Sequence, residues 1–122
     1  MHVVAVAVGG AVGALLRYAL RELLPPLADG RIPLATIAAN VAGSFLLGLL
    51  GGVMLQRAAI PAELRLGVTV GLLGAFTTFS AFSLETVDLL RGGNWPFAVL
   101  NVVLSVSGAL LALWAGQQIA RP

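Results

Sequence analysis

Apolar residues occupy four long stretches of the chain, and short clusters that contain charges, glycine or proline separate these stretches. The stretches are residues 3–24, 33–55, 62–90 and 95–119. Each reaches the length of about 20 residues that an α-helix needs to cross the hydrocarbon core of a bilayer. Lone strands in lipid would leave their backbone polar groups without hydrogen bonds. The pattern therefore predicts an all-α membrane protein, with residues 1–122 forming one domain of four transmembrane helices.

Composition supports this prediction and excludes several functions. Hydrophobic residues make up 59% of the 122 residues and charged residues only 10%, whereas soluble domains have about 25% charged residues. All seven basic residues are arginines, and they form no basic stripe that would indicate a nucleic-acid partner. Cysteine is absent, and the only histidine is His2. Because no paired carboxylates, Ser-His-Asp set or phosphate-binding loop occurs, we do not expect an enzyme.

The arginines give almost no signal for the orientation of the chain in the membrane. Four spans place three of them on the side of the termini and three on the other side, namely Arg57, Arg65 and Arg121 against Arg21, Arg31 and Arg91. A chain without a positive-inside bias can insert in both orientations, and two opposite copies can pair around a two-fold axis in the membrane plane. The alternative is that one arginine has a stronger effect on insertion than the others and fixes a single orientation.

Pairs of glycines four residues apart occur in three of the stretches: Gly9 and Gly13, Gly48 and Gly52, and Gly67 and Gly71. Small residues at this spacing let the backbones of two helices approach closely. The pairs predict tight helix contacts and do not indicate a function.

The third stretch is too long for a straight crossing. As one helix its 29 residues would measure roughly 43 Å, against a hydrocarbon thickness of about 30 Å. Gly71 and Gly74 give backbone freedom. Hydroxyl groups that compete with helix hydrogen bonds follow at Thr77, Thr78 and Ser80. A break here would free carbonyls that suit a hard cation and amides that suit an anion, whereas the alternative is a tilted, unbroken helix.

Two other stretches carry polar residues one helical turn apart. Asn40 is followed by Ser44 in the second stretch, and Asn101 by Ser105 in the fourth. A buried amide must find a hydrogen-bond partner or line a wet path. Together with the hydroxyls of the third stretch, these residues predict a polar track through the bundle.

Four further residues have a functional and a structural interpretation. Phe79 and Phe82 share a face of a resumed helix, where their positive ring edges can meet an anion, although aromatic residues at this spacing more often face lipid or the core. Arg17 either extends to the interface or acts as a vestibule cation that concentrates anions. Glu85 is either a hydrated acid at a helix end or a member of an ion pair or pore.

These residues belong to motifs that resemble a known family. The chain resembles the CrcB or Fluc family of bacterial fluoride channels in three motifs: GGAVGALLRY (residues 9–18), NVAGSFLLG (residues 40–48) and GLLGAFTTFSAFSLE (residues 71–85). The match covers all four stretches in order. It departs from the commoner third motif, GGxTTFSTF, at Ala75 and Ala81.

The resemblance implies a channel in the bacterial plasma membrane that passively exports toxic fluoride. It also implies an antiparallel dual-topology homodimer, whose third helix is broken mid-membrane, with a structural sodium ion at the dimer centre. By motif position, the backbone carbonyls of Gly74 and Thr77 from each subunit would hold the sodium. Arg17 and Glu85 match the first-span arginine of the family and the acid after its third motif. The implied pore residues are Asn40, Thr78, Phe79, Ser80, Phe82, Asn101 and Ser105.

Two other functions are compatible with four spans. A small multidrug-type exporter coupled to protons needs a carboxylate embedded in the membrane, whereas the first stretch carries Arg17. A scaffold subunit without transport would use its glycines only for packing. Fluoride efflux from liposomes, with chloride as the control, distinguishes these functions.

Overall fold

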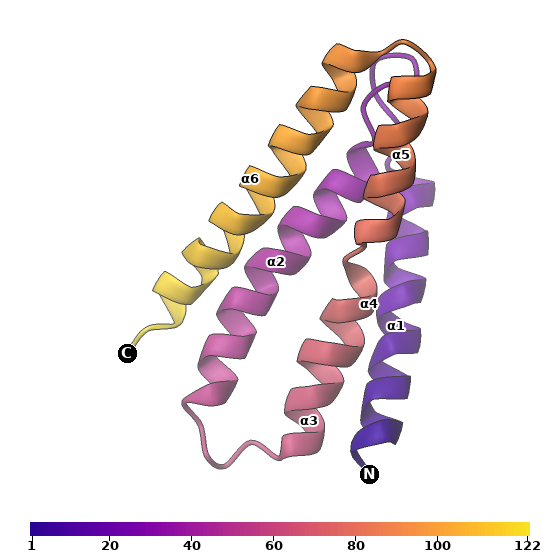
Figure 1. The fold of residues 1–122 in the computed structure, drawn as a ribbon. Coiled ribbons are helices and arrows are strands. Elements are labelled where there is room, and N and C mark those ends of the chain that lie inside the picture. The colour runs from indigo at the N-terminus through magenta and orange to yellow at the C-terminus, as the bar shows by residue number, and fades with distance from the viewer.

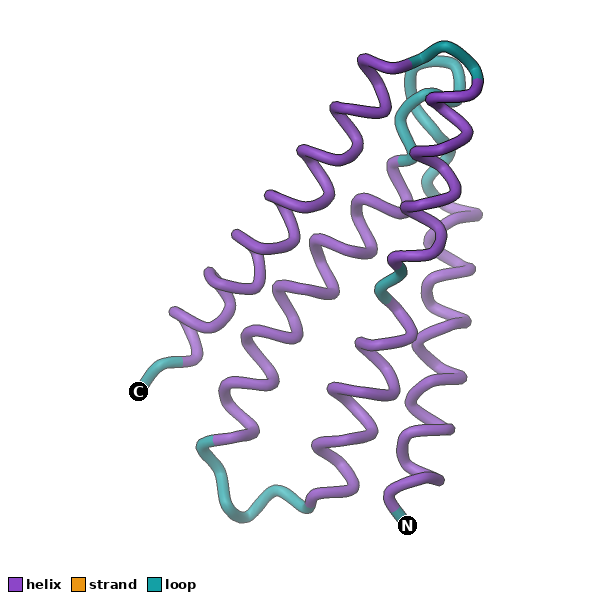
Figure 2. Tube along the Cα trace, in the orientation of Figure 1, coloured by secondary structure: helices purple, strands orange, loops and turns teal.

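The computed structural model describes residues 1–122 as helices joined by short connections (Figure 1). Its elements are α1 (His2–Leu23), α2 (Leu34–Leu55), α3 (Ala62–Leu66), the π-helix η1 (Gly67–Leu73), α4 (Gly74–Phe76), α5 (Phe79–Arg91) and α6 (Trp95–Ala120). No strand is present, as the tube in Figure 2 shows. Four helical segments, with α3 to α5 taken as one, are long and apolar enough to cross a membrane. The prediction of an all-α protein with four spans is confirmed.

The spans pack as two pairs, and the third span contacts both. α2 lies along α6, and α1 lies along the first half of the third span, from α3 to α4 (Figure 1). Beyond its interruption, the third span continues as α5 and packs against α6. Both termini and the α2–α3 connection lie at one end of the molecule, and the other two connections lie at the opposite end (Figures 1 and 2).

Glycines bring the paired helices into backbone contact. A Cβ atom on Gly9 or Gly13 of α1 would overlap the carbonyl oxygens of Gly67 and Leu72 in η1. Gly48 of α2 meets a backbone carbonyl of α6 in the same way. The predicted close helix contacts are therefore confirmed at these positions, where only a hydrogen atom fits.

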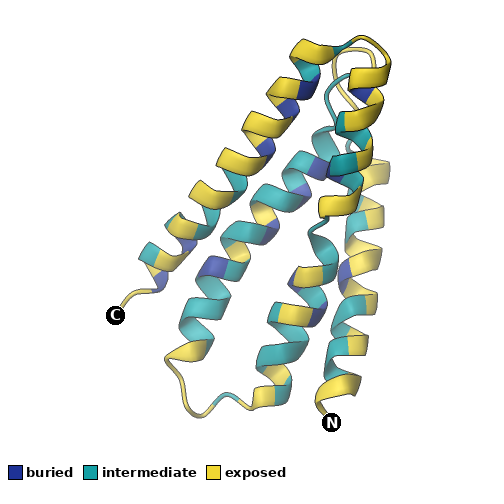
Figure 3. Cartoon of the chain, viewed as in Figure 1, coloured by how far each residue is buried: buried dark blue, intermediate teal, exposed yellow.

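Most of the molecular surface is apolar and uncovered. Only 14 of the 122 residues are buried, and exposed residues follow the outer sides of α1 and α6 (Figure 3). A single chain of this kind has too small a core to hide its apolar side chains from water. Lipid, or a second protein surface, must cover them.

The third span is interrupted at two consecutive threonines. Thr77 (φ −80°, ψ 155°) and Thr78 (φ −152°, ψ 121°) have extended backbones between α4 and α5. The predicted break is present, and it lies at Thr77 and Thr78, two of the three hydroxyl residues at which it was predicted. Gly74 has helical angles (φ −63°, ψ −37°), and Gly71 is buried against α1. Gly71 serves packing, Gly74 is exposed and stays helical, and the chain leaves the helix where Asn40 can supply hydrogen bonds.

A π-helix that the residue pattern did not predict precedes the break. In η1 each backbone N–H reaches back five residues, which makes the helix wider than an α-helix. The Thr69 hydroxyl also donates to the Arg65 carbonyl at 2.8 Å. η1 is the segment that contacts the glycines of α1, so the irregular turn lies at the tightest helix contact of the first pair.

Candidate functional site

The interruption is held by the side chain of Asn40 on α2. Asn40 Oδ1 accepts a hydrogen bond from the Thr78 amide at 2.7 Å, and Asn40 Nδ2 donates to the Thr78 carbonyl at 2.9 Å. The side-chain amide thus supplies both backbone hydrogen bonds that the extended residue lacks. No hydrogen bond within the chain uses the second Nδ2 hydrogen, which remains free to donate.

The hydroxyl groups beside the break differ in what they bind. Thr78 Oγ1 accepts from the Ala81 amide at 3.1 Å and so caps the start of α5. It also lies 3.1 Å from Ser80 Oγ, and this hydroxyl pair is exposed. Thr77 Oγ1 instead donates to the Leu73 carbonyl at 3.0 Å. The Thr78 and Ser80 hydroxyls are therefore the pair that is available to a ligand.

Carbonyl groups at the end of the first half-helix are only partly satisfied. Arg17 Nε on α1 donates to the Ala75 carbonyl at 3.1 Å. No hydrogen bond within the chain reaches the carbonyls of Phe76 or Thr77, and the Gly74 carbonyl receives only a 3.4 Å contact from the Thr77 hydroxyl. The structure thus places Arg17 beside the break, and it leaves the two carbonyls predicted to bind sodium almost unused.

The second half-helix begins with free amides and a pair of aromatic rings. No hydrogen bond within the chain uses the N–H groups of Phe79 and Ser80, and the start of a helix carries a partial positive charge. The rings of Phe79 and Phe82 have centroids 5.3 Å apart and planes inclined by 46°. Phe82 is buried at 8% exposure, whereas Phe79 is 75% exposed.

A cavity of about 280 Å³ lies against the break. Its lining consists of Asn40, Ser44, Thr77, Thr78, Phe79, Phe82, Ser105, Val106, Ala109 and Leu110. Five of the seven predicted pore residues are in this lining, and the exceptions are Ser80 and Asn101. The structure therefore gathers amide, hydroxyl and aromatic groups from α2, α5 and α6 around one space.

Asn101 lies behind the cavity wall in a hydrogen-bonded network between α5 and α6. Asn101 is 2% exposed and Ser105 is 5% exposed. Asn101 Nδ2 donates to Thr86 Oγ1 at 2.9 Å, and the Ser105 hydroxyl donates to Asn101 Oδ1 at 3.1 Å. Sequence reasoning missed Thr86, although its position four residues after Phe82 puts it on the same helix face.

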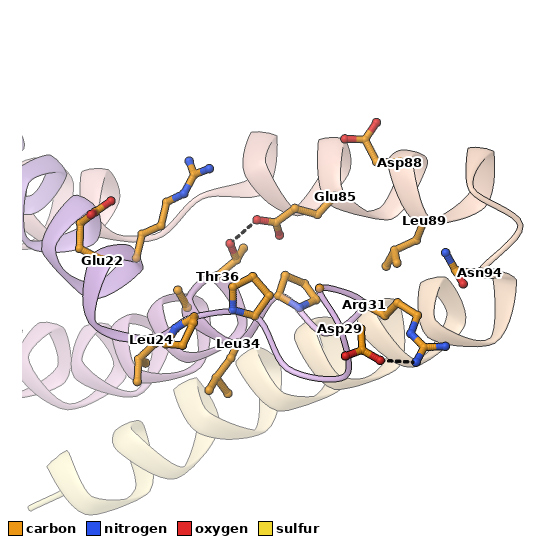
Figure 4. Close-up of a pocket in the computed structure, with 16 residues that line it drawn as sticks. Glu22, Leu24, Asp29, Arg31, Leu34, Thr36, Glu85, Asp88, Leu89 and Asn94 are labelled. Atoms are coloured by element: carbon orange, nitrogen blue, oxygen red, sulfur yellow. Dashed lines mark hydrogen bonds and ion pairs between the residues drawn. The ribbon is translucent and has the colours of Figure 1, made fainter.

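A second cavity, of about 620 Å³, opens at the end of the molecule that holds the α1–α2 connection (Figure 4). There the Thr36 hydroxyl donates to Glu85 Oε1 at 2.7 Å, and no partner in the chain reaches Glu85 Oε2. Arg31 contacts Asp29 in the same cavity at 3.4 Å. Thr36 was missed as well, although it precedes Asn40 by one turn on the helix face that also carries Ser44.

The fold and the site define a small multi-pass membrane protein with a polar centre at a broken helix. The chain belongs to the family described as CrcB-like protein, Camphor Resistance (CrcB), which matches residues 4–117. The resemblance inferred from the three motifs is thereby confirmed.

Several bacterial proteins are similar to almost the whole chain. The "Fluoride-specific ion channel FluC 2" of Symbiobacterium thermophilum is 45% identical over 115 residues, which cover 94% of each protein. The "Fluoride-specific ion channel FluC" of Ruminiclostridium cellulolyticum is 44% identical over 99% of this chain and 93% of the relative. Its namesake in Geobacter sulfurreducens is 47% identical over 98% of this chain and 96% of the relative. With its four apolar spans, the chain is a multi-pass bacterial membrane protein.

Proposed function

We propose that this protein is a fluoride-selective channel through which fluoride leaves the cytoplasm passively, and that fluoride passes the interrupted third span. The observation that carries the proposal is the set of unused donors at the break. They are the second Nδ2 hydrogen of Asn40, the amides that begin α5, and the one hydroxyl hydrogen of the exposed Thr78–Ser80 pair that their mutual hydrogen bond leaves free. The names of the bacterial relatives support the choice of ion.

Fluoride needs such a set of donors because it is small and strongly hydrated. Its transfer into hydrocarbon without replacement hydrogen bonds would be prohibitively unfavourable. Asn40, the hydroxyls and the α5 amides replace water, and the positive edges of Phe79 and Phe82 add weaker attraction. A narrow path of this kind excludes larger halides by size. Fluoride that enters a cell as HF and ionises there would leave down its own gradient.

The proposed channel consists of two copies in opposite orientations. Phe79 is 75% exposed, and the Thr78–Ser80 hydroxyl pair also lies at the surface. Hydroxyl groups at mid-membrane depth are unfavourable against lipid, so a second protein surface is the better cover. The balanced arginines permit both insertion senses.

Orientation can be measured directly because the chain contains no cysteine. A single cysteine is introduced in the α2–α3 connection by Ala59→Cys, or in the α1–α2 connection by Pro26→Cys. Each variant is exposed to a membrane-impermeant maleimide in intact spheroplasts. Opposite orientations predict that about half of each variant is labelled. Complete labelling of one variant and none of the other would refute dual topology.

We also propose a structural sodium ion between the two copies. The carbonyls of Gly74 and Thr77 fit such an ion, because they are hard oxygen donors with almost no hydrogen bonds of their own. The ion would satisfy these oxygens and add positive potential beside the anion path. The neighbouring Ala75 carbonyl is already hydrogen-bonded to Arg17 Nε, so it would not bind the ion.

The functional proposal is tested with purified protein in liposomes loaded with potassium fluoride or potassium chloride. A potassium ionophore balances charge, and an ion-selective electrode follows anion efflux. The proposal predicts rapid fluoride efflux and chloride efflux at the level of empty liposomes. A scaffold predicts no efflux of either ion. A proton-coupled exporter of cationic drugs predicts drug movement that depends on a pH gradient, without fluoride efflux, and either result would overturn the proposal.

A further inference from the structure

The hydrogen-bonded network behind the cavity contains an asparagine that can be satisfied in two orientations. In the observed arrangement the Ser105 hydroxyl donates to Asn101 Oδ1, Asn101 Nδ2 donates to Thr86 Oγ1, and Thr86 Oγ1 donates to the Phe82 carbonyl at 2.7 Å. The chain of donors runs away from the cavity. Ser105 lines the cavity, yet its only hydroxyl hydrogen points at Asn101.

An anion beside Ser105 would therefore meet an oxygen and no hydrogen. The hydroxyl can turn toward the anion by rotation alone, but this would leave Asn101 Oδ1 without a partner. Asn101 is 2% exposed, so water does not replace the lost bond. Leaving a buried acceptor unsatisfied is unfavourable by about 1–3 kcal/mol.

Rotation of the Asn101 amide by half a turn avoids this loss. Nδ2 then donates to Ser105 Oγ, and Oδ1 accepts from the Thr86 hydroxyl, which is able both to donate and to accept. The Phe82 carbonyl keeps the backbone hydrogen bond that the α-helix provides. Ser105 is left with a free hydrogen directed at the cavity, and no buried group has lost its partner.

We propose that Asn101 is a two-position amide switch, coupled to anion occupancy of the adjacent cavity, that lets the Ser105 hydroxyl donate to the cavity instead of to Asn101. Without an anion, the observed orientation has one more internal hydrogen bond. With an anion, the flipped orientation recovers that bond through Ser105. Asn101 and Thr86 are thus positioning residues, since they act on the ion through Ser105. The inference rests on the proposed function, because it assigns the ion in the cavity to the fluoride path.

Asn40 provides an internal control for this switch. Its amide is also hydrogen-bonded at both ends, but its partners are the backbone N–H and C=O of Thr78. A backbone N–H only donates and a C=O only accepts. A flip of Asn40 would place donor against donor and acceptor against acceptor, so Asn40 keeps one orientation whether or not an anion is present.

The test is nuclear magnetic resonance of the full-length protein in detergent micelles, labelled with ¹⁵N only at asparagine. The chain contains three asparagines, so three side-chain NH₂ groups are observed, and the third belongs to Asn94. Sodium fluoride is titrated against sodium chloride at equal ionic strength. The Asn101 signals are expected to shift saturably with fluoride and to stay in place with chloride. For Asn40, fluoride should shift the signal of the free Nδ2 hydrogen, while the signal of the hydrogen bonded to the Thr78 carbonyl stays in place.

Two variants connect the shift to the network. Ser105→Ala should remove the fluoride response of Asn101 while the Asn40 and Asn94 signals continue to report a folded protein. Thr86→Val should move the resting Asn101 signal, because its acceptor is gone, and Thr86→Ser should restore it. If Ser105→Ala fails to assemble, the shifts of the Asn101 signals in fluoride and in chloride are compared in the unmodified protein. Equal behaviour in the two salts would then refute the switch.

The outcomes separate this inference from the functional proposal. If liposomes show fluoride efflux but the Asn101 signals do not respond to fluoride, or respond equally in Ser105→Ala, the switch is refuted and the channel stands. If liposomes show no fluoride efflux, the channel proposal fails and the switch fails with it.

Discussion

Replacing Asn40 by Asp tests whether the anion passes the Asn40 side chain, which is hydrogen-bonded to the Thr78 backbone at the broken helix. The new carboxylate still accepts from the Thr78 amide but cannot donate to the Thr78 carbonyl, which loses its 2.9 Å hydrogen bond. A carboxylate oxygen of the new side chain then faces the Thr78 carbonyl oxygen. This carbonyl is left without a hydrogen bond, which destabilises the protein by about 1–3 kcal/mol. We expect Asn40→Asp to assemble with a lowered Tm.

The added charge has a larger effect on transport than on stability. For an anion about 5 Å from the carboxylate, at an effective dielectric constant of about 20, the repulsion is about 3 kcal/mol. A change of ~1.4 kcal/mol alters a rate about tenfold, so fluoride efflux should fall about 100-fold. The rate loss therefore exceeds what a modest fraction of unfolded protein would produce.

The assay is fluoride efflux from liposomes at matched protein density, with size-exclusion chromatography to verify assembly. Gln117→Glu is the control, because it makes the same amide-to-carboxylate change on an exposed position of α6 outside both cavities. Its efflux should stay within about twofold of the unmodified protein, since exposed charges interact weakly. Asn40→Asp with efflux equal to the control would place Asn40 off the ion path.

Four further results are expected. Gly13→Ala should lower stability by about 1–3 kcal/mol by forcing a methyl group into a backbone contact, whereas Gly10→Ala, with nothing within 4 Å of its Cβ, should be neutral or stabilising in thermal unfolding. Phe79→Ile and Phe82→Ile should each reduce fluoride efflux without loss of assembly, and normal efflux in both would remove the rings from the mechanism. Thr78→Ala should lower stability by about 1 kcal/mol through loss of the α5 cap, and Thr78→Ser should retain it; equal stability of the two variants would contradict the capping role. Replacement of sodium by potassium or lithium should impair efflux, and a channel indifferent to the exchange would argue against the carbonyl site.

Hydropathy was sufficient to predict the spans, because helix length in lipid is fixed by the thickness of the bilayer. The break was also predictable, since hydroxyl groups compete with the helix ladder and the stretch is too long to cross straight. The pattern named both glycines and threonines in this segment, and it did not decide which of them leave the helix. Gly71 and Gly74 have the intrinsic freedom to leave the helix, but Gly71 is needed for contact with α1. Thr78 leaves the helix instead because Asn40, from another span, takes over its backbone hydrogen bonds.

The candidate site shows the same division between local and tertiary causes. One-turn spacing identified Asn40 and Ser105, which line the cavity. Spacing does not say which polar residue of a face reaches the cavity and which lies behind it, so Asn101 was expected in the lining and is buried against α5. The spacing from Phe82 placed Thr86 on the same helix face. Its role, however, depends on the hydrogen bond from Asn101, which lies 15 residues away in the chain.

The most direct measurement is an experimental structure of the assembled protein in a lipid nanodisc with sodium present. We expect two copies inserted in opposite senses, with the carbonyl oxygens of Gly74 and Thr77 from both copies around a common ion. Each copy should have an extended backbone at Thr77 and Thr78. Copies with the same orientation, or a continuous helix through these two threonines, would contradict the account.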